Sequence, residues 1–267
     1  MILGYFHKGS GLGNQLHRYV ATRVLAKDKD YDFGMLGQFK GDDFMKIDKG
    51  KEAPKMGVTY FDITGRTLLP EFPQTDFGVF LENNIKDEFG NVLRWYDPEF
   101  NFIEDNTIID GEFQDERYFG HRLKEIDEWL KVESMQLDEN LCIIGFRGGE
   151  FALYPDLFLP KEYWAEAKVL MLQNNINMKF EVHTDDPELA QKFFPDYKII
   201  HDIGINWRSV RYSKYAIIAN SSFYILPRLL QHYSNKNAFT VSPRYWARRN
   251  TKVWSMPQNY YKCFTYL

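Results

Sequence analysis

The sequence has little cysteine, no excess of basic residues and no long apolar run. Its 267 residues include two cysteines, Cys142 and Cys263, and no Cys/His cluster with zinc spacing, so neither a disulfide framework nor a structural zinc site is expected. The 33 Lys and Arg against 37 Asp and Glu give a net charge of −4, which excludes a polybasic protein that coats nucleic acid. No stretch of about 18 uncharged apolar residues is present, as a membrane span requires.

The composition favours a globular protein of one or two domains. Hydrophobic residues make up 44% of the chain and aromatic residues 17%, which is enough to form a core and unlike a disordered chain. The N-terminal apolar stretch is too short for a signal peptide. We therefore expect a cytoplasmic protein, and peripheral association with a membrane stays open.

The first half of the chain opens with a strand, a glycine turn and a helix. Residues 2–6 are apolar, residues 9–13 are rich in glycine, and apolar residues recur at helical spacing over 14–27. Short strands and long loops are expected over 31–106. A strand at 107–111, a helix at 116–131 and a linker at 132–140 follow.

The second half alternates regularly between strands and helices, which is typical of a parallel sheet with helical crossovers. Asp186 and Pro187 mark one helix start, as an N-cap and a first-turn proline. The expected strands are 141–146, 179–183, 198–201, 216–220 and 238–241. The expected helices are 160–172, 187–194, 207–215 and 222–233.

The first candidate for chemistry is the glycine turn before the first helix, with Gly11, Gly13, Asn14 and Gln15. Its glycines allow close approach of a ligand, and the helix N-terminus favours a phosphate, a carboxylate or a sugar. A tight connection without a ligand is an equally good interpretation. A dinucleotide fingerprint fits less well, because Asn14 and Gln15 replace its last glycine.

The second candidate is Arg147, which follows a buried strand and precedes two glycines and Glu150. At the carboxyl end of a parallel strand, a guanidinium can bind a diphosphate and stabilise the charge on a departing nucleotide. The alternative is a surface pair between Arg147 and Glu150 beside a turn.

Two further strand ends carry polar side chains. Asp186 is best explained as a helix cap, whereas Asp185 is free to accept hydrogen bonds from a guanine base. Asn220, Ser221 and Ser222 lie at the head of a helix, where hydroxyls and amides can hold a phosphate. The paired acids lack a clear third ligand for a metal.

Taken in order, these segments resemble the fucosyltransferase superfamily, in particular the bacterial α-1,2-fucosyltransferase-like family. Residues 11–21 follow its signature GGLGNQLFQYA, and residues 111–119 are similar to G-Y-[WF]-Q-S-E-K-Y-F. Residues 145–151 resemble the hallmark H-x-R-R-G-D-Y, with an S/T-D-D element at 184–186. The motif I-I-A-N-S-S-F is reproduced at 217–223.

The resemblance implies an α/β, GT-B-like fold of two Rossmann-like domains facing a cleft, the C-terminal one a doubly wound parallel sheet. Residues 1–135 would form the acceptor-side domain and 136–267 the nucleotide-sugar domain, with the last segment a candidate to pack back on the first. It implies inverting transfer of fucose or a related sugar from a GDP-sugar such as GDP-fucose to a glycan hydroxyl, in polysaccharide biosynthesis. No metal and no cofactor would be required.

The same resemblance assigns roles to residues. Arg147 would bind the diphosphate and support its departure, Asp185 would face the base, and Asn14 would reach the donor from the opposite domain. The remaining donor-binding candidates are Gly11, Gly13, Gln15, Asn220, Ser221, Ser222 and Phe223.

The chain departs from the hallmark at Gly145, where the family has histidine, and at Gly148, where it has a second arginine. A site with fewer hydrogen-bonding groups discriminates less between bases, so the donor base is open. Glu150 is the first candidate for the general base, ahead of Asp156 and His17. The alternatives are a non-catalytic nucleotide- or glycan-binding descendant and, with less support, an NAD-dependent oxidoreductase.

Overall fold

A computed structural model describes residues 1–7, 10–37, 77–82, 84–86, 92–94, 96–246 and 260–267, in two compact units. The first unit comprises Met1–Lys131 and also includes Tyr260, and the second begins at Val132. Of the last segment, residues 247–259 lie outside the described part of the chain. Tyr261–Leu267 belong to the second unit.

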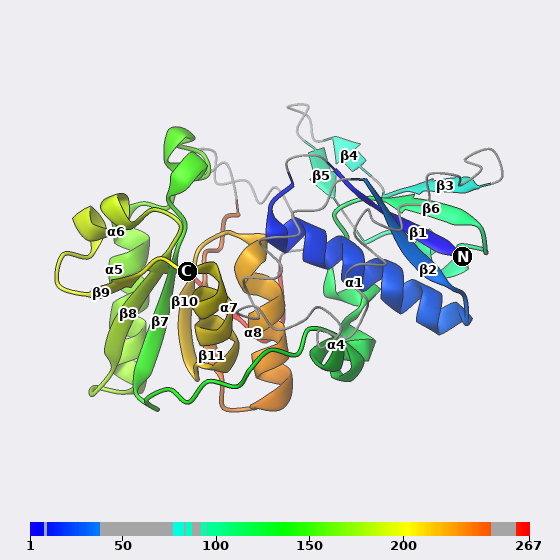
Figure 1. The fold of residues 1–267 in the computed structure, drawn as a ribbon. Coiled ribbons are helices and arrows are strands. Elements are labelled where there is room, and N and C mark those ends of the chain that lie inside the picture. Colours follow the sequence, from blue (N-terminus) through cyan, green and yellow to red (C-terminus); the bar gives the residue numbers. More distant parts are fainter. Residues whose placement is uncertain (8–9, 38–76, 83, 87–91, 95, 247–259) are drawn as a thin grey trace. The chain divides into compact units, whose positions relative to one another are not determined.

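The first unit is built on a four-stranded parallel sheet with the order β2-β1-β6-β3 (Figure 1). Strand β1 is central, and its apolar side chains Ile2 and Leu3 are fully buried. The predicted strands at 2–6 and 107–111 are confirmed. The strands are β1 (Ile2–Phe6), β2 (Phe33–Gly37), β3 (Gly78–Leu81) and β6 (Thr107–Asp110), beside a hairpin of β4 (Asn84–Lys86) and β5 (Val92–Arg94).

Helix α1 (Leu12–Lys29) connects β1 to β2 and packs against both strands. Leu16, Val20 and Val24 recur at four-residue spacing and are fully buried. The helix ends at Asp30, which has a left-handed conformation with φ 57°. The predicted helix at 14–27 is thus confirmed, with two additional residues at each end.

The single helix predicted over 116–131 is wrong. The chain instead forms two 3-10 turns, Glu116–Tyr118 and Gly120–Arg122, and the short helix α4 (Leu123–Trp129). Phe119, with φ −145°, has no helical conformation and separates the two turns. Burial of Phe119 between them explains why an apolar helical pattern is present without a continuous helix.

The second unit is a six-stranded, entirely parallel sheet with the order β12-β11-β10-β7-β8-β9, so the predicted doubly wound sheet is confirmed. The chain starts at the central β7, builds outward to β9, and returns to build outward through β10, as in Rossmann folds. The strands are β7 (Leu141–Phe146), β8 (Lys179–Thr184), β9 (Lys198–Ile200), β10 (Tyr215–Ile218), β11 (Phe239–Ser242) and β12 (Thr265–Tyr266).

Helices cover both faces of this sheet. Helix α5 lies on one face, and α7 and α8, which pack against each other, lie on the other (Figure 1). Helix α7 begins four residues earlier than predicted, because Asp202 accepts a hydrogen bond from the Ile205 amide and caps it. The helices are α5 (Lys161–Asn174), α6 (Pro187–Phe193), α7 (Ile203–Tyr212) and α8 (Ser222–Ser234).

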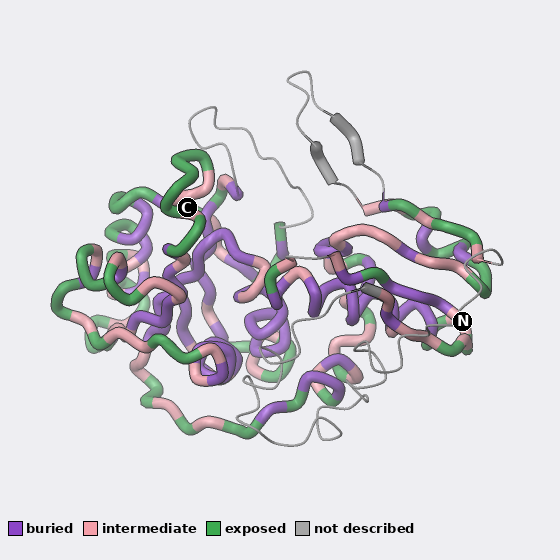
Figure 2. Tube along the Cα trace, turned by 45° about the horizontal axis from the view of Figure 1, so that its top comes forward, coloured by how far each residue is buried: buried purple, intermediate pink, exposed green. Residues whose placement is uncertain are grey.

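In both units the buried residues follow the strands and the inner faces of the helices (Figure 2). The core of the second unit also contains Arg228, a fully buried residue of α8. Its guanidinium donates to Thr240 Oγ1 at 2.8 Å and to the carbonyl oxygens of Val210 and Ser213 at 2.9 and 2.7 Å. Arg228 therefore ties α8 to β11 and to the end of α7.

Candidate functional site

The second unit brings two of the predicted motifs to one edge of its sheet. Strands β7 and β10 are parallel neighbours, and the Ala219 amide donates to the Gly145 carbonyl at 2.9 Å beyond the last ladder pair. Arg147 follows β7, and Ser221 precedes α8 after β10. The strand order reverses between these two strands, which is where open α/β sheets bind ligands.

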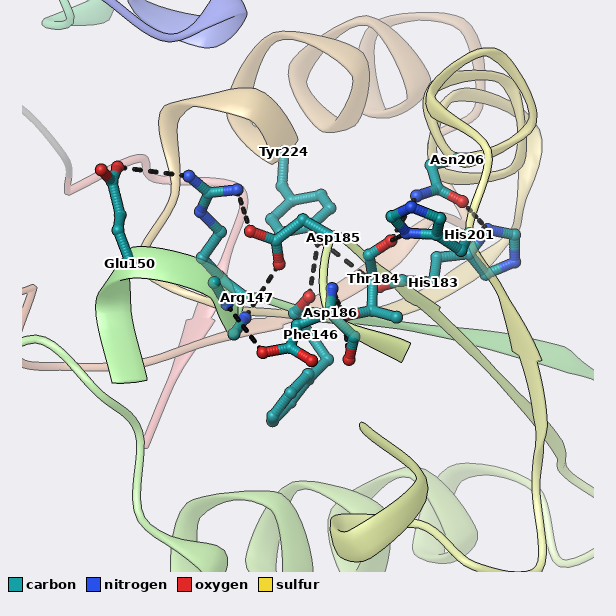
Figure 3. Close-up of polar contacts among 12 residues, drawn as sticks. Phe146, Arg147, Glu150, His183, Thr184, Asp185, Asp186, His201, Asn206 and Tyr224 are labelled. Carbon is teal, nitrogen blue, oxygen red and sulfur yellow. Dashed lines mark hydrogen bonds and ion pairs between the residues drawn. The ribbon is translucent and has the colours of Figure 1, made fainter. Parts of the chain in front are cut away.

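Arg147 lies at this edge between two carboxylates (Figure 3). Its Nη1 donates to Asp185 Oδ2 in a short contact, and its Nη2 donates to Glu150 Oε1 at 3.4 Å. The side chains of Arg147 and Asp185 are 28% and 29% exposed, whereas that of Glu150 is 69% exposed. Asp185 therefore contacts the guanidinium more closely than Glu150 does, and it is less exposed to solvent.

The two glycines after Arg147 allow the side chains of Asp185 and Asp186 to approach the main chain. The Gly148 amide donates to Asp185 at 2.9 Å, and the Gly149 amide donates to Asp186 at 3.2 Å. A Cβ at Gly148 would lie 2.6 Å from Asp186 Cβ, and Gly149 has φ +45°. The second arginine of the resembled hallmark therefore has no room at position 148.

Asp186 also caps α6 by accepting the Leu189 amide at 3.0 Å, as predicted. Asp185, which the resemblance assigned to the base, contacts Arg147 and the Gly148 amide. The described contacts of Asp185 are those of a group that orients the guanidinium.

Gly145, at the position of the hallmark histidine, faces the ring of Tyr224 from α8. A Cβ at Gly145 would lie 2.8 Å from the Tyr224 ring. The Tyr224 hydroxyl donates to the carbonyl oxygens of Phe146 at 3.3 Å and His183 at 3.5 Å. Burial raises the pKa of Tyr224 above its usual value, so the phenol stays neutral. Tyr224 therefore occupies the space that a side chain at 145 would need.

A buried polar network holds β8, which carries the acid pair (Figure 3). The ring of His183 contacts Asn206 Oδ1 and Glu181 Oε1, both at 2.9 Å. Asn206 Nδ2 in turn donates to the Thr184 carbonyl at 3.2 Å. The hydrogen bond with His183 lowers the pKa of Glu181 to about 2, so this carboxylate is ionised at neutral pH.

Residues 220–223 are buried or half-buried. Asn220 is buried and donates to the carbonyl oxygens of Leu157 and Trp246 at 2.9 and 2.5 Å. Phe223 packs edge to face on Trp207, with ring centroids 5.6 Å apart. The Ser221 amide donates to the Ala219 carbonyl at 2.8 Å, so it is committed to the turn. The hydroxyl groups of Ser221 and Ser222 also lie at the start of α8.

The glycine turn belongs to the first unit and is tied to its own surroundings. Gln15 Nε2 donates to the Ser10 carbonyl at 2.9 Å, and Asn14 Oδ1 accepts from Gln114 at 3.0 Å. Gly11 precedes α1, and Gly13 lies in its first turn. The structure thus joins the motif at 11–21 to that at 111–119, through Asn14 and Gln114.

Two of the candidate bases differ in their surroundings. His17 is fully buried, its Nδ1 lies 2.8 Å from the Gly13 carbonyl oxygen, and burial lowers its pKa to about 4. It is therefore neutral and enclosed, and the interpretation of His17 as a general base is wrong. Asp156 is exposed in the segment after β7.

Sequence reasoning missed a group of ionisable residues at the carboxyl edge of the first sheet. His7 Nε2 lies 2.6 Å from Asp110 Oδ1, and Arg18 Nη2 donates to Glu112 at 2.7 Å. Glu82 follows β3 at the same edge, where its amide donates to the Asp110 carbonyl at 2.8 Å. His7 and Asp110 lie at the ends of two correctly predicted strands, but the sequence did not indicate that these strands are neighbours.

Neither a group of metal-ligating side chains nor a helix long and apolar enough to cross a membrane is found within the described ranges. Comparison with protein-family models gives no match, and comparison with curated proteins gives none.

Solved structures do show similarity. The E. coli heptosyltransferase WaaC with ADP is similar at 10% identity and a TM-score of 0.45, over 99% of this chain and 92% of that one. A glycosyl transferase family 9 protein from Veillonella parvula is similar at 11% identity and a TM-score of 0.48, over 100% of this chain and 86% of that one.

Proposed function

We propose that the protein is a metal-independent, inverting glycosyltransferase that moves fucose or a related sugar from a GDP-sugar to a glycan hydroxyl. The observation that carries the proposal is Arg147 beside the start of α8, where the strand order of the second sheet reverses. The collinear motifs at 11–21, 111–119 and 217–223 support the same reaction class. The proposed partners are a nucleotide sugar and a glycan, and the proposed location is the cytoplasm.

The contacts of Arg147 suit a pyrophosphate that arrives and departs. Glu150 is largely exposed and held at 3.4 Å, so an incoming phosphate can replace it at Nη2. Asp185 keeps its contact with Nη1 and holds the guanidinium in place. When the bond between the sugar and the phosphate breaks, the cation stabilises the negative charge on the leaving diphosphate.

The hydroxyl groups of Ser221 and Ser222 supply uncharged contacts to the phosphates at the start of α8. Phe223 would lie beside the nearby sugar, and Asn220 supports this turn from within the core. In the first unit, Gly11, Gly13, Asn14 and Gln15 would contribute contacts to the donor. The hallmark histidine, which helps to read guanine in the resembled superfamily, is replaced by Gly145 and the ring of Tyr224, so selectivity for guanine is tested separately from the reaction class.

Binding of a panel of nucleotides tests the proposal. We expect GDP to raise the melting temperature selectively over UDP, dTDP, ADP, CMP and NAD, because a ligand that binds only the folded state stabilises it. Arg147→Ala should weaken GDP binding about tenfold to a hundredfold, since a hydrogen bond to a charged group contributes ~1.5–3 kcal/mol. Glu150→Gln should strengthen it about threefold, because it removes a competing exposed carboxylate.

Lys236→Ala is the matched control, because it removes the same charge from an exposed residue just beyond the opposite end of α8. If Arg147→Ala and Lys236→Ala lost GDP affinity equally, the proposed binding site at Arg147 would be overturned. A melting-temperature rise with NAD and not with GDP would favour the oxidoreductase. Binding of GDP without release of sugar from GDP-fucose or any other GDP-sugar would favour a non-catalytic descendant.

A further inference from the structure

The strand order of the second sheet indicates where a nucleoside attached to the proposed diphosphate would lie. Counted from β7, the order β9-β8-β7-β10-β11-β12 is 3-2-1-4-5-6, which is the order of the dinucleotide-binding fold. In that fold the pyrophosphate lies at the turn after the first strand, and an acidic residue after the second strand contacts the ribose. Arg147 follows β7, and Asp185 follows β8. The nucleoside would therefore extend from β7 towards β8, and its base towards β9.

His201 is the first residue after β9 at this edge of the sheet (Figure 3). Strands β8 and β9 pair in parallel as far as His183 and Ile200, so His201 lies beside Thr184, the residue before Asp185. Nδ1 of His201 lies 3.2 Å from the Thr184 carbonyl oxygen, and the residue is exposed. An exposed imidazole is thus held next to the acid pair, on the side where the base would lie.

The contact with Thr184 determines which nitrogen of His201 presents a lone pair. A carbonyl oxygen only accepts hydrogen bonds, so Nδ1 carries the proton of the neutral imidazole. Nε2 is then a hydrogen-bond acceptor, and His201 has no second hydrogen bond or ion pair within the described ranges. The ring is therefore oriented by the protein and leaves Nε2 for an N–H group of a ligand.

The other groups expected to read the base have different contacts. Asp185 contacts Arg147 and the Gly148 amide, and the ring of Tyr224 fills the space beside Gly145. An acceptor such as Nε2 suits a base that carries an exocyclic amine, and uracil and thymine have none. In the proposed donor this amine is the 2-amino group of guanine.

We propose that His201 reads the base of the donor, with Nε2 accepting a hydrogen bond from the 2-amino group of guanine; this inference rests on the proposed transferase function. Arg147, two strands away, would contact the diphosphate alone. The two residues should therefore make separable contributions to binding. Removal of the imidazole and removal of the 2-amino group delete the same hydrogen bond, so both changes together should cost no more than one of them.

The test measures the affinities of GDP and of inosine diphosphate (IDP), which lacks the 2-amino group. Wild type should bind GDP about three- to tenfold more tightly than IDP, which is the effect of one hydrogen bond. His201→Ala should lose GDP affinity by the same factor and bind IDP as wild type does. His121→Ala is the matched control, because it removes a 53% exposed histidine from the first unit, and it should bind both nucleotides as wild type does.

Inorganic pyrophosphate separates recognition of the base from a general effect on the site. Arg147→Ala should weaken binding of GDP, IDP and pyrophosphate by the same factor, whereas His201→Ala should leave pyrophosphate affinity unchanged. Equal affinities of wild type for GDP and IDP would overturn the inference and leave the proposed function standing. Unchanged GDP affinity in His201→Ala, or an equal loss for GDP and IDP, would do the same. Absence of GDP binding in the wild type would overturn both.

Discussion

The first and second units each place charged side chains where a parallel sheet reverses its strand order, but they arrange the charges differently. In the second unit, Asp185 and Asp186 are satisfied by backbone amides, and the guanidinium of Arg147 is partly exposed. In the first unit the guanidinium of Arg18 is buried, and the exposed pair consists of His7 and Asp110.

This difference in the exposed groups indicates that the two parallel sheets suit different ligands. An exposed guanidinium favours a ligand that carries negative charge throughout, such as a pyrophosphate. An exposed imidazole beside a carboxylate favours a neutral hydroxyl that loses a proton. The burial of Arg18 therefore distinguishes a structural cation in the first unit from the proposed ligand-binding cation, Arg147, in the second.

The largest expected effect tests this distinction directly. Arg18→Met removes a cation that is 4% exposed, together with its hydrogen bonds to Glu112 and to the Tyr5 carbonyl. We expect the free energy of unfolding to fall by about 4 kcal/mol. Arg147→Met should lower it by less than about 1 kcal/mol, because its side chain is 28% exposed. Urea unfolding followed by circular dichroism measures both, and equal losses would contradict the comparison.

A smaller effect tests the glycine of the second unit. Gly145→Ala should lower the free energy of unfolding by about 3 kcal/mol, because the new Cβ would lie 2.8 Å from the Tyr224 ring. Gly11→Ala is the control, since no described atom lies within 4 Å of its added Cβ. In a Tyr224→Ala background the penalty at 145 should largely disappear. A full penalty in that background would show that Tyr224 is not the obstacle.

The smallest effect should be common to both units. His17 and His232 lie in different units, and burial lowers the pKa of each to about 4, from an ordinary value of 6.5. Between pH 6.5 and 4 the unfolded chain binds more protons than the folded chain. The free energy of unfolding should therefore fall as the pH decreases, by about 2 kcal/mol per histidine at pH 5.

The measurement compares unfolding at pH 7 and pH 5 in wild type, His17→Gln and His232→Gln. Each variant should lose about 2 kcal/mol less than wild type between these two pH values. A variant that loses as much as wild type would show that its histidine does not contribute to acid sensitivity.

Much of the second unit could be predicted from sequence, because its strands and helices alternate with short connections. That alternation places Arg147 and Ser221 at the carboxyl ends of parallel strands, and the structure has them on neighbouring strands. The pairing of Arg147 with Asp185 and the contact of Gly145 with Tyr224 could not be predicted. Both contacts depend on how side chains from different elements pack together, and local sequence patterns give no information about that packing.

The first unit was less predictable, because its site depends on long-range pairing. His7 and Asp110 lie 103 residues apart, and the intervening chain has no pattern that indicates the register of β1 with β6. The broken helix around Phe119 shows a second limit. Apolar spacing indicated burial correctly there but not backbone continuity.

The buried guanidinium of Arg228 has a consequence for the phosphate contacts proposed for Ser221 and Ser222. From the middle of α8 it donates hydrogen bonds to oxygens of Thr240, Val210 and Ser213, so α8 is anchored to β11 and to the end of α7. The tip that begins at Ser222 is consequently in position before any ligand arrives. A ligand that binds at the start of α8 does not have to order the helix first. Less of the ligand's intrinsic affinity is therefore lost to conformational entropy.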